Sequence, residues 1–244
     1  MIDKYPQIKP MGDRAILIDF EPEISEETLK TLLNIKKIIE YELVEEKVEV
    51  INTYRSLLIV YVSTIENFYD KVSALKELIT RANIGKNLNS QIYHIPVCYE
   101  PEFGLDLELI SKTNNLKISD IIQLHTSPIY TVYFTGFLPG FLYLGGLDEK
   151  LQISRKSSPR MKVEKGAVGI GENQTGIYPK TSPGGWQIIG NSPVTFFDKN
   201  RIPPCIISAG DKVKFYSISK TQYSQISEEI KSKNFQLKSE KYHG

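Results

Sequence analysis

Apolar and polar positions alternate in short runs along the first hundred residues. Residues 15–20 and 57–62 are rich in aliphatic and β-branched side chains, and this pattern predicts a strand at each position. Residues 44–51 alternate valines with charged side chains and predict a third strand, and residues 92–97 predict a fourth. The sequence therefore indicates four strands in this part of the chain.

Two amphipathic helices are predicted between these strands. Ser25 stands where a helix N-cap is expected, and leucine and isoleucine side chains then recur at helical spacing from Leu29 to Ile39. Residues 68–79 repeat this spacing and predict a second helix. With the strand at 92–97 closing the set, the order β-α-β-β-α-β is that of a small ferredoxin-like α/β domain.

The pattern changes near Ser90, so we expect a first domain at residues 1–89 and a second at 90–244. Short helices are predicted at 106–112 and 119–125. From 136 to 190 the chain then holds 11 of its 16 glycines, a density that favours tight loops between short strands and a mostly β domain. The last predicted elements are strands at 187–189, 194–197, 205–208 and 212–216 and a polar helix from about Thr221.

Charge and composition remove several classes of function. The chain has 30 basic and 29 acidic residues, a formal charge of +1, so it lacks the basic excess that favours nucleic-acid binding. Its longest apolar run, residues 57–62, is far too short to cross a membrane. The first residues do not resemble a secretory signal, so we expect a cytoplasmic protein. In that compartment Cys98 and Cys205 are expected to be free thiols.

Common catalytic motifs are missing from the sequence. The spacing of Gly140 and Gly145 resembles a phosphate-binding loop, but Gly146 stands where that motif requires lysine. The sequence contains no H-E-x-x-H, C-x-x-C or G-x-S-x-G motif. Its three histidines are scattered along the chain, so we expect no zinc site formed by this chain alone.

A basic strip lies inside the glycine-rich segment. The segment from Lys150 to Lys180 contains seven basic and two acidic residues, a local net charge of 7 − 2 = +5. Arginine suits carboxylate or phosphate oxygens, and nearby backbone N–H groups can bind the same anion. We therefore consider Arg155 and Arg160 candidate anion ligands, and Lys156 and Lys165 weaker ones. The alternative is that these are solvated loop charges.

Two further segments offer polar groups beside aromatic rings. Ser182 precedes the turn formed by Pro183, Gly184 and Gly185, and the only tryptophan, Trp186, follows. Residues 174–179 supply the Gln174 amide and the Tyr178 phenol. Both segments could instead be turns packed against the core. His125, at the end of a predicted helix, is either a packing residue or a site residue.

Long motifs in the second domain resemble a known family. They are the run from Tyr130 to Leu147 and the segments at 158–160, 174–179 and 182–186. Together they resemble the B-subunit family of bacterial 5-oxoprolinase, also described as KipI-like and as allophanate hydrolase subunit 1. The resemblance extends from Gly12 to Asp211 and so covers most of the chain.

The resemblance implies an α+β protein with a small ferredoxin-like N-terminal domain and a cyclophilin-like β-barrel domain. It implies a component of an ATP-dependent hydrolase, inactive alone, that opens 5-oxoproline to L-glutamate with the A and C subunits of 5-oxoprolinase as partners. ATP with Mg²⁺ is the expected co-substrate, and which of the three proteins binds it stays open. The residues expected to line a substrate or nucleotide pocket are His125, Arg155, Arg160, Gln174, Tyr178, Ser182, Gly184, Gly185 and Trp186.

The same resemblance leaves two other functions open. One is a regulatory module that binds a sensor histidine kinase and inhibits it. The other is one half of an assembly of the urea carboxylase or allophanate hydrolase type. No acid, base or nucleophile is assigned among the candidate residues, and no metal ligand is expected on this chain.

Overall fold

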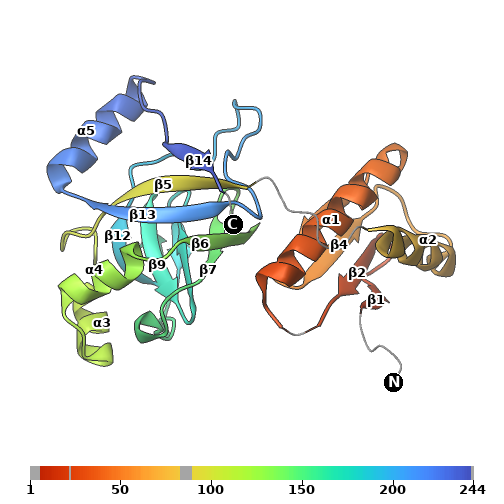
Figure 1. Cartoon of the computed structure of the whole chain (residues 1–244), viewed down its shortest axis with the longest axis horizontal. Coiled ribbons are helices and arrows are strands. Elements are labelled where there is room, and N and C mark those ends of the chain that lie inside the picture. Colours follow the sequence, from red (N-terminus) through yellow and green to blue (C-terminus); the bar gives the residue numbers. More distant parts are fainter. Residues whose placement is uncertain (1–5, 22, 83–89, 243–244) are drawn as a thin grey trace. The chain divides into compact units, whose positions relative to one another are not determined.

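The computed structural model describes residues 6–21, 23–82 and 90–242 of the chain. The chain folds as two compact units, Met1–Leu88 and Asn89–Gly244. Each unit has its own sheet and its own hydrophobic core. Figure 1 shows a small sheet with two helices in the first unit and a larger set of strands in the second. No helix in the described ranges combines the length and apolarity needed to span a membrane.

The described part of the first unit contains a four-stranded antiparallel sheet with the order β1-β2-β4-β3. The strands are β1 (Gln7–Pro10), β2 (Ala15–Asp19), β3 (Glu49–Asn52) and β4 (Ser56–Val60). Buried residues alternate with more exposed ones along β2 and β4, as expected for a sheet with one face on the core. Ile16, Ile18, Leu57 and Ile59 on that face are fully buried.

Helices α1 (Glu26–Glu42) and α2 (Phe68–Arg81) pack against this buried face. The Ser25 side chain caps α1 by accepting a hydrogen bond from the Thr28 N–H, so the predicted N-cap is confirmed. Leu32, Ile35 and Ile39 of α1 share one hydrophobic cluster with Leu75 of α2 and with the sheet. Both helices therefore lie where the apolar spacing of the sequence placed them.

The fourth strand of this sheet is not the predicted one. Strand β5 (Gln91–Cys98), which contains residues 92–97, belongs to the second unit. The edge position beside β2, where residues 92–97 were expected, is occupied by β1. The sheet therefore keeps a ferredoxin-like strand order, but its edge strand comes from the start of the chain. The predicted strand at 44–51 is partly wrong, because Val44–Glu46 forms a short 3-10 helix before β3.

The described strands of the second unit close into a seven-stranded barrel. The order β12-β9-β10-β7-β6-β13-β5 is closed by a pairing between Asn191 of β12 and Cys98 of β5. Strands β5 and β13 pair in parallel, and the other neighbours are antiparallel. The remaining barrel strands are β6 (Tyr130–Thr135), β7 (Leu142–Gly145), β9 (Ala167–Gly171), β10 (Gln174–Ile177), β12 (Gln187–Asn191) and β13 (Lys212–Ile218). The predicted α+β fold class, with a β-barrel after the small domain, is confirmed.

Three helices and three short strands surround the barrel in the described residues. Figure 1 shows α5 on one side of the barrel strands and α3 and α4 on the other. A two-stranded ribbon formed by β8 and β11 lies outside the barrel sheet. These elements are α3 (Leu107–Asn114), α4 (Ile118–Thr126), α5 (Lys220–Lys231), β8 (Arg160–Val163), β11 (Ser182–Gly184) and β14 (Ser239–Lys241).

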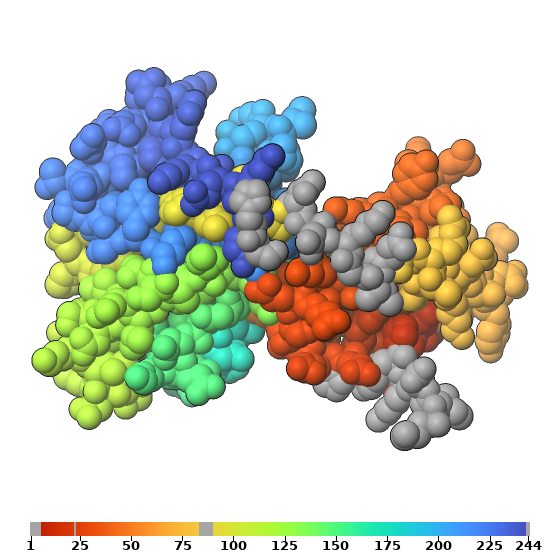
Figure 2. Space-filling model, viewed as in Figure 1, coloured from red at the N-terminus to blue at the C-terminus, as the bar shows by residue number. Residues whose placement is uncertain are grey.

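Two predicted strands near the end of the chain are reduced to a single bridge. Residues 194–197 and 205–208 form no strand and meet only where Phe197 pairs with Cys205. The loop that these two residues enclose, light blue in Figure 2, projects from the surface of the second unit. Cys98 is buried and Cys205 half-buried, and both are free thiols as expected.

Candidate functional site

Trp186 lies on an outer face of the barrel that is lined with glycine. A Cβ atom added at Gly171 of β9 would lie 2.6 Å from the indole nitrogen, and one at Gly176 of β10 would lie 3.0 Å from Cζ3. A Cβ at Gly169 would lie 3.1 Å from the Trp186 Cβ. The glycines of both strands therefore leave the space that the indole fills. Trp186 is 5% exposed and packs in a cluster with Phe141 and Tyr178.

Arg155 covers the edge of this cluster. Its guanidinium carbon lies 5.7 Å from the centroid of the Trp186 ring, within cation–π distance. The Arg155 side chain is exposed, and within the described residues it forms no ion pair with a carboxylate. Burial raises the pKa of Tyr178, and the Trp186 backbone N–H and the charge of Arg155 act against that rise. At neutral pH the cluster thus offers a neutral phenol beside a cation.

The β8–β11 ribbon passes close to Tyr178. Gly184 of β11 pairs with Arg160 of β8, and a Cβ atom at Gly184 would lie 2.4 Å from the Tyr178 hydroxyl oxygen. The Gly185 carbonyl accepts a hydrogen bond of 2.7 Å from the Lys156 N–H. The Ser182 hydroxyl donates to the Pro183 carbonyl at 3.1 Å. The ribbon therefore ties the segment around Arg155 to the Trp186 cluster.

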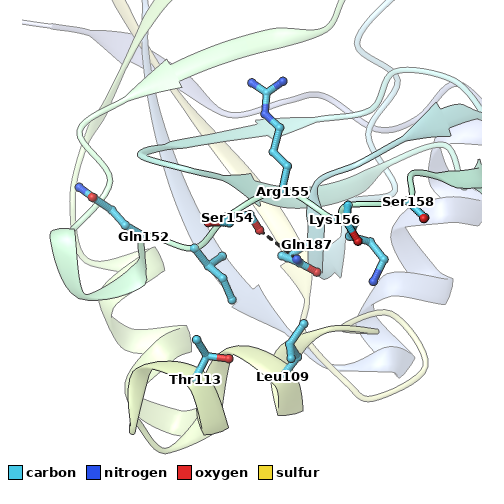
Figure 3. A pocket seen from close by; sticks show the side chains of 10 residues that line it. Leu109, Thr113, Gln152, Ser154, Arg155, Lys156, Ser158 and Gln187 are labelled. Atoms are coloured by element: carbon cyan, nitrogen blue, oxygen red, sulfur yellow. Dashed lines mark hydrogen bonds between the residues drawn. The ribbon is translucent and has the colours of Figure 1, made fainter.

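A pocket of about 710 Å³ opens between the segment 152–158 and helix α3, and we call it the α3 pocket. Figure 3 shows Leu109 and Thr113 of α3 along one side and Ser154 and Lys156 along the other. Figure 3 shows the Arg155 side chain directed away from α3; its guanidinium lies against the Trp186 ring. The pocket is lined by Leu109, Thr113, Gln152, Ile153, Ser154, Arg155, Lys156, Ser157, Ser158 and Gln187.

Gln187 is the most buried polar residue of this lining, with 5% of its surface exposed. Its Nε2 donates a hydrogen bond of 3.0 Å to the Ser154 carbonyl, drawn as a dashed line in Figure 3. Its Oε1 is buried and has no partner within the described part of the chain. Gln187 thus fixes the segment that carries Arg155 and retains one unused acceptor.

Asp106, just before α3, joins several parts of the site. Its Oδ1 accepts a hydrogen bond of 2.7 Å from Arg160 Nη2 and lies 3.8 Å from Lys156 Nζ. Its Oδ2 accepts a hydrogen bond of 2.6 Å from the Ile188 N–H of β12. Asp106 is 5% exposed, so these contacts are shielded from water. The sequence prediction missed this residue because its partners lie 54 and 82 positions away.

Arg160 and Arg155 line different pockets. Arg160 is paired with Asp106 and lines a second pocket of about 480 Å³, together with Phe103 and Tyr223. Arg155 lines the α3 pocket. The expected pair of anion-binding arginines is therefore divided: one guanidinium neutralises a carboxylate, and the other is free to meet an external anion.

His125 lies in the barrel core, away from both pockets. It is fully buried, its Nδ1 lies 2.7 Å from the Tyr99 hydroxyl, and its Nε2 lies 3.0 Å from the Thr175 hydroxyl. The Thr175 hydroxyl donates to the Gly169 carbonyl, so it accepts from Nε2–H and Nδ1 accepts from Tyr99. Burial lowers the pKa of His125 from 6.5 to about 3. Of the two interpretations that the sequence left open for His125, the structure agrees with the packing residue.

The structure brings most of the predicted residues together, although not around one cavity. Arg155, Tyr178, Gly184, Gly185 and Trp186 lie in or against the aromatic cluster outside the barrel. Ser182 is half-buried on the neighbouring ribbon, and Gln174 is half-buried on β10 with an Oε1 that has no partner within the described residues. Of the ten residues that line the α3 pocket, only Arg155 was among those expected to line a site; Lys156 was considered a weaker anion ligand, and Ser158 and Gln187 were missed.

The α3 pocket presents hydrogen-bond donors and positive charge. Lys156 and three serine hydroxyls can bind the oxygens of a carboxylate or a phosphate there, whereas the Arg155 guanidinium lies on the other side of the segment, against Trp186. Within the described ranges, no group of three or more histidine, cysteine, aspartate or glutamate side chains is placed to hold a metal ion. The side chains of this lining are thus of the kind that suits an anionic ligand.

Comparisons with known proteins identify the family. The family model described as "Carboxyltransferase domain, subdomain C and D" matches residues 6–207. The B subunit of 5-oxoprolinase from Bacillus subtilis (strain 168) is 38% identical over 233 residues, which cover 91% of this chain and 97% of that protein.

Two solved structures share the fold. TTHA0988 has a TM-score of 0.72 and 29% identity, and the match covers 84% of this chain and 40% of that one. The urea amidolyase of K. lactis has a TM-score of 0.82 at 23% identity, with 96% of this chain and 16% of that one covered. The family-model match spans residues 6–207 and so covers both units, in agreement with a resemblance that extends from Gly12 to Asp211. The chain belongs to the B-subunit family of 5-oxoprolinase.

Proposed function

We propose that this chain is the B subunit of an ATP-dependent 5-oxoprolinase that opens 5-oxoproline to L-glutamate together with its A and C subunits. The observation that carries the proposal is the 38% identity to the Bacillus subtilis protein, which extends over nearly the full length of both proteins. The name of that relative describes one component of a multi-subunit enzyme. We therefore expect the isolated chain to be inactive.

The chemistry of the substrate explains the need for ATP. A five-membered lactam is a weak electrophile, and water attacks its carbonyl carbon slowly. ATP supplies a phosphoryl group that converts the lactam oxygen into a leaving group. Water then adds to that carbon and the C–N bond breaks, which opens the ring to an acyl phosphate. A second water hydrolyses the acyl phosphate, so that glutamate, ADP and phosphate are the products. Cationic and N–H groups around the oxygens lower the barrier by stabilising the developing negative charge.

This chain's own residues would bind and orient anions in that reaction. Lys156, with the hydroxyls of Ser157 and Ser158, fits the carboxylate of 5-oxoproline or a phosphate of ATP, and Arg155 offers a second anion contact beside Trp186. Gln187 would hold the segment in place through the Ser154 carbonyl. The same residues do not form a magnesium site, since the described chain offers no suitable carboxylate cluster. We derive no metal-dependent step from this chain.

The proposal is tested by reconstitution from purified proteins. The chain is mixed with the A-subunit and C-subunit homologues of its own genome, and glutamate release from 5-oxoproline is followed with and without ATP. We expect release only when all three proteins and ATP are present, with one ADP formed per glutamate. Release at the same rate without this chain, or no release by the complete set, contradicts the proposal.

A second candidate is a component of a carboxyltransferase assembly that acts on urea or a related amide. The description of the matching family model favours it, because that model is named for a carboxyltransferase domain. An anion-binding pocket also suits a carboxylated substrate. The same reconstituted set should be offered urea and allophanate in place of 5-oxoproline. Turnover of those substrates alone would favour the second candidate.

A further inference from the structure

The side-chain amide of Gln187 has a fixed orientation. Its Nε2 donates a hydrogen bond of 3.0 Å to the Ser154 carbonyl, and a carbonyl oxygen can only accept. A flipped amide would place two acceptors against each other, so Oε1 is directed away from Ser154. This oxygen has no hydrogen-bond partner within the described part of the chain, although Gln187 is only 5% exposed.

An unpaired acceptor at this position costs free energy. A buried carbonyl oxygen gives up its hydrogen bonds to water, and the loss is recovered only when a donor is supplied. Gln187 lines the α3 pocket, and Figure 3 shows its amide between the segment that carries Ser154 and Leu109 of α3. Flexible lining side chains commonly change rotamer when a ligand binds, so a ligand in this pocket can reach the shielded oxygen. The missing donor can therefore come from a bound molecule.

Positive charge lies close to this acceptor. Asp106 is bonded twice to Ile188, the residue that follows Gln187: its Oδ2 accepts from the Ile188 N–H at 2.6 Å, and its N–H donates to the Ile188 carbonyl at 2.8 Å. Lys156 Nζ lies 3.8 Å from Asp106 Oδ1, which is too long for a hydrogen bond, so this ion pair leaves the ammonium donors available. These contacts place the Lys156 ammonium beside the part of β12 that carries Gln187.

An ammonium group and a neutral acceptor together suit a ligand that has a carboxylate next to an N–H group. 5-Oxoproline has this arrangement, because its ring nitrogen is bonded to the carbon that carries the carboxylate. Lys156 would bind the carboxylate, and Gln187 Oε1 would accept a hydrogen bond from the lactam N–H. Two attachments to neighbouring groups fix the orientation of the ring. The lactam carbonyl, on the other side of the nitrogen, then stays free to react.

We propose that Gln187 is the residue by which the α3 pocket distinguishes a lactam from the corresponding lactone. The inference rests on the proposed function, since it takes 5-oxoproline as the ligand of this pocket. The lactone 5-oxotetrahydrofuran-2-carboxylate has the same ring size and the same carboxylate, with a ring oxygen in place of the N–H group. Beside this molecule Oε1 would meet a second acceptor and stay unpaired. Gln187 thus determines specificity and takes no part in bond making or breaking.

The first test compares two probes, 5-oxoproline and the lactone, on the isolated wild-type chain. Calorimetry at pH 7 gives the dissociation constant of each. We expect the lactam to bind at least roughly 10-fold more tightly, because only the lactam supplies the donor that the buried oxygen lacks. Equal affinities for the two probes, or no binding of 5-oxoproline to the chain, overturn the proposal. This comparison requires no variant.

Two variants then show whether Gln187 is the source of the preference. Gln187→Met keeps the length of the side chain and removes the acceptor, so the preference for the lactam should fall below about 3-fold. A melting curve first confirms that this variant folds without its bond to Ser154. Gln123→Met is the matched control: Gln123 is an exposed glutamine of α4 that lines neither pocket, and its replacement should leave the wild-type preference unchanged. An undiminished preference in folded Gln187→Met overturns the proposal.

The result is distinguishable from the outcome for the proposed reaction. Preferential lactam binding by this chain, together with no glutamate release by the complete three-protein set, supports the role of Gln187 and contradicts the proposed function. Glutamate release by that set, together with equal binding of lactam and lactone, contradicts the role of Gln187 alone.

Discussion

Asp106 and Arg160 form an ion pair that is largely withdrawn from solvent. Arg160 Nη2 lies 2.7 Å from Asp106 Oδ1, and the side chains of Arg160 and Asp106 are 23% and 6% exposed. The other carboxylate oxygen accepts the Ile188 N–H, so one aspartate connects the ribbon strand β8 to the barrel strand β12. A charge held in this way stabilises the position of the ribbon beside the aromatic cluster.

Replacing Asp106 with alanine should destabilise the protein. The Arg160 guanidinium would remain half-buried without its carboxylate, and the Ile188 N–H would lose its side-chain acceptor. Because Arg160 is partly exposed, we expect the free energy of unfolding to fall by about 2–3 kcal/mol, below the full cost of an unpaired buried charge. Denaturant unfolding measures this change.

The matched control is Glu164→Ala. Glu164 pairs with Lys162 at 2.7 Å, but both side chains are more than 60% exposed. An exposed pair contributes little, so this variant should unfold at nearly the same denaturant midpoint as wild type. Equal stability losses in the two variants would show that Asp106 does not have the anchoring role assigned to it.

Substitution of Gly171 should disturb Trp186. In Gly171→Ala the new methyl group would approach the indole nitrogen to 2.6 Å, so the indole or the strand must move. We expect a loss of about 2 kcal/mol in unfolding free energy and a changed emission spectrum, since Trp186 is the only tryptophan. Gly185→Ala is the control: its Cβ would meet its nearest neighbour at 3.7 Å, an ordinary contact. An unchanged spectrum in Gly171→Ala would contradict the close packing described.

His125 should make the folded state sensitive to mild acid. Burial lowers its pKa to about 3, whereas the unfolded chain binds a proton at about 6.5. The unfolded state therefore holds more protons below pH 6.5, and stability that is complete above pH 6.5 is lost as the pH falls toward 3. The slope of the free energy of unfolding should be about 0.7 kcal/mol per pH unit at pH 6.5 and should approach about 1.4 kcal/mol per pH unit near pH 5.

One variant separates this effect from general acid sensitivity. His125→Gln has no titrating group at this position, so its stability should be nearly constant between pH 6.5 and 5, although lower at pH 7. The wild-type chain, measured alongside, supplies the slope for comparison. Denaturant midpoints at half-unit pH steps give both slopes. Identical slopes for wild type and His125→Gln would rule out His125 as the source.

Sequence patterns predicted where helices and strands form better than they predicted which strands pair with one another. The helices around Leu29 and at 68–79 form as expected because capping and apolar spacing are local properties. The strand at 92–97 also forms, but it pairs with β13, more than a hundred residues away. Strand β1 gave no signal, since a four-residue edge strand that ends in Pro10 shows no alternation. Strand pairing is a long-range property that a local pattern does not contain.

The candidate site shows the same limit. Arg155 and Trp186 were both chosen from sequence, and they meet as a cation and an aromatic ring. Arg160 looked equivalent to Arg155 in the basic strip, but a distant aspartate neutralises it. Gln187 belongs to a strand that was predicted, and only the arrangement of α3 and the segment 152–158 places it in a pocket. Residue type indicated the chemistry, and tertiary contacts decided which residues are free to perform it.

The most direct test of the proposed role is the rate of glutamate release by the complete three-protein set carrying Arg155→Ala in this chain. Arg155 is exposed, so its loss should leave the fold intact while removing the free cation beside Trp186. We expect the rate to fall at least roughly 10-fold, as for removal of a charged group from an anion site. Lys150→Ala, an exposed lysine five residues away, should keep more than about half of the rate. Equal rates for Arg155→Ala and wild type, or no glutamate release by the wild-type set, would contradict the account.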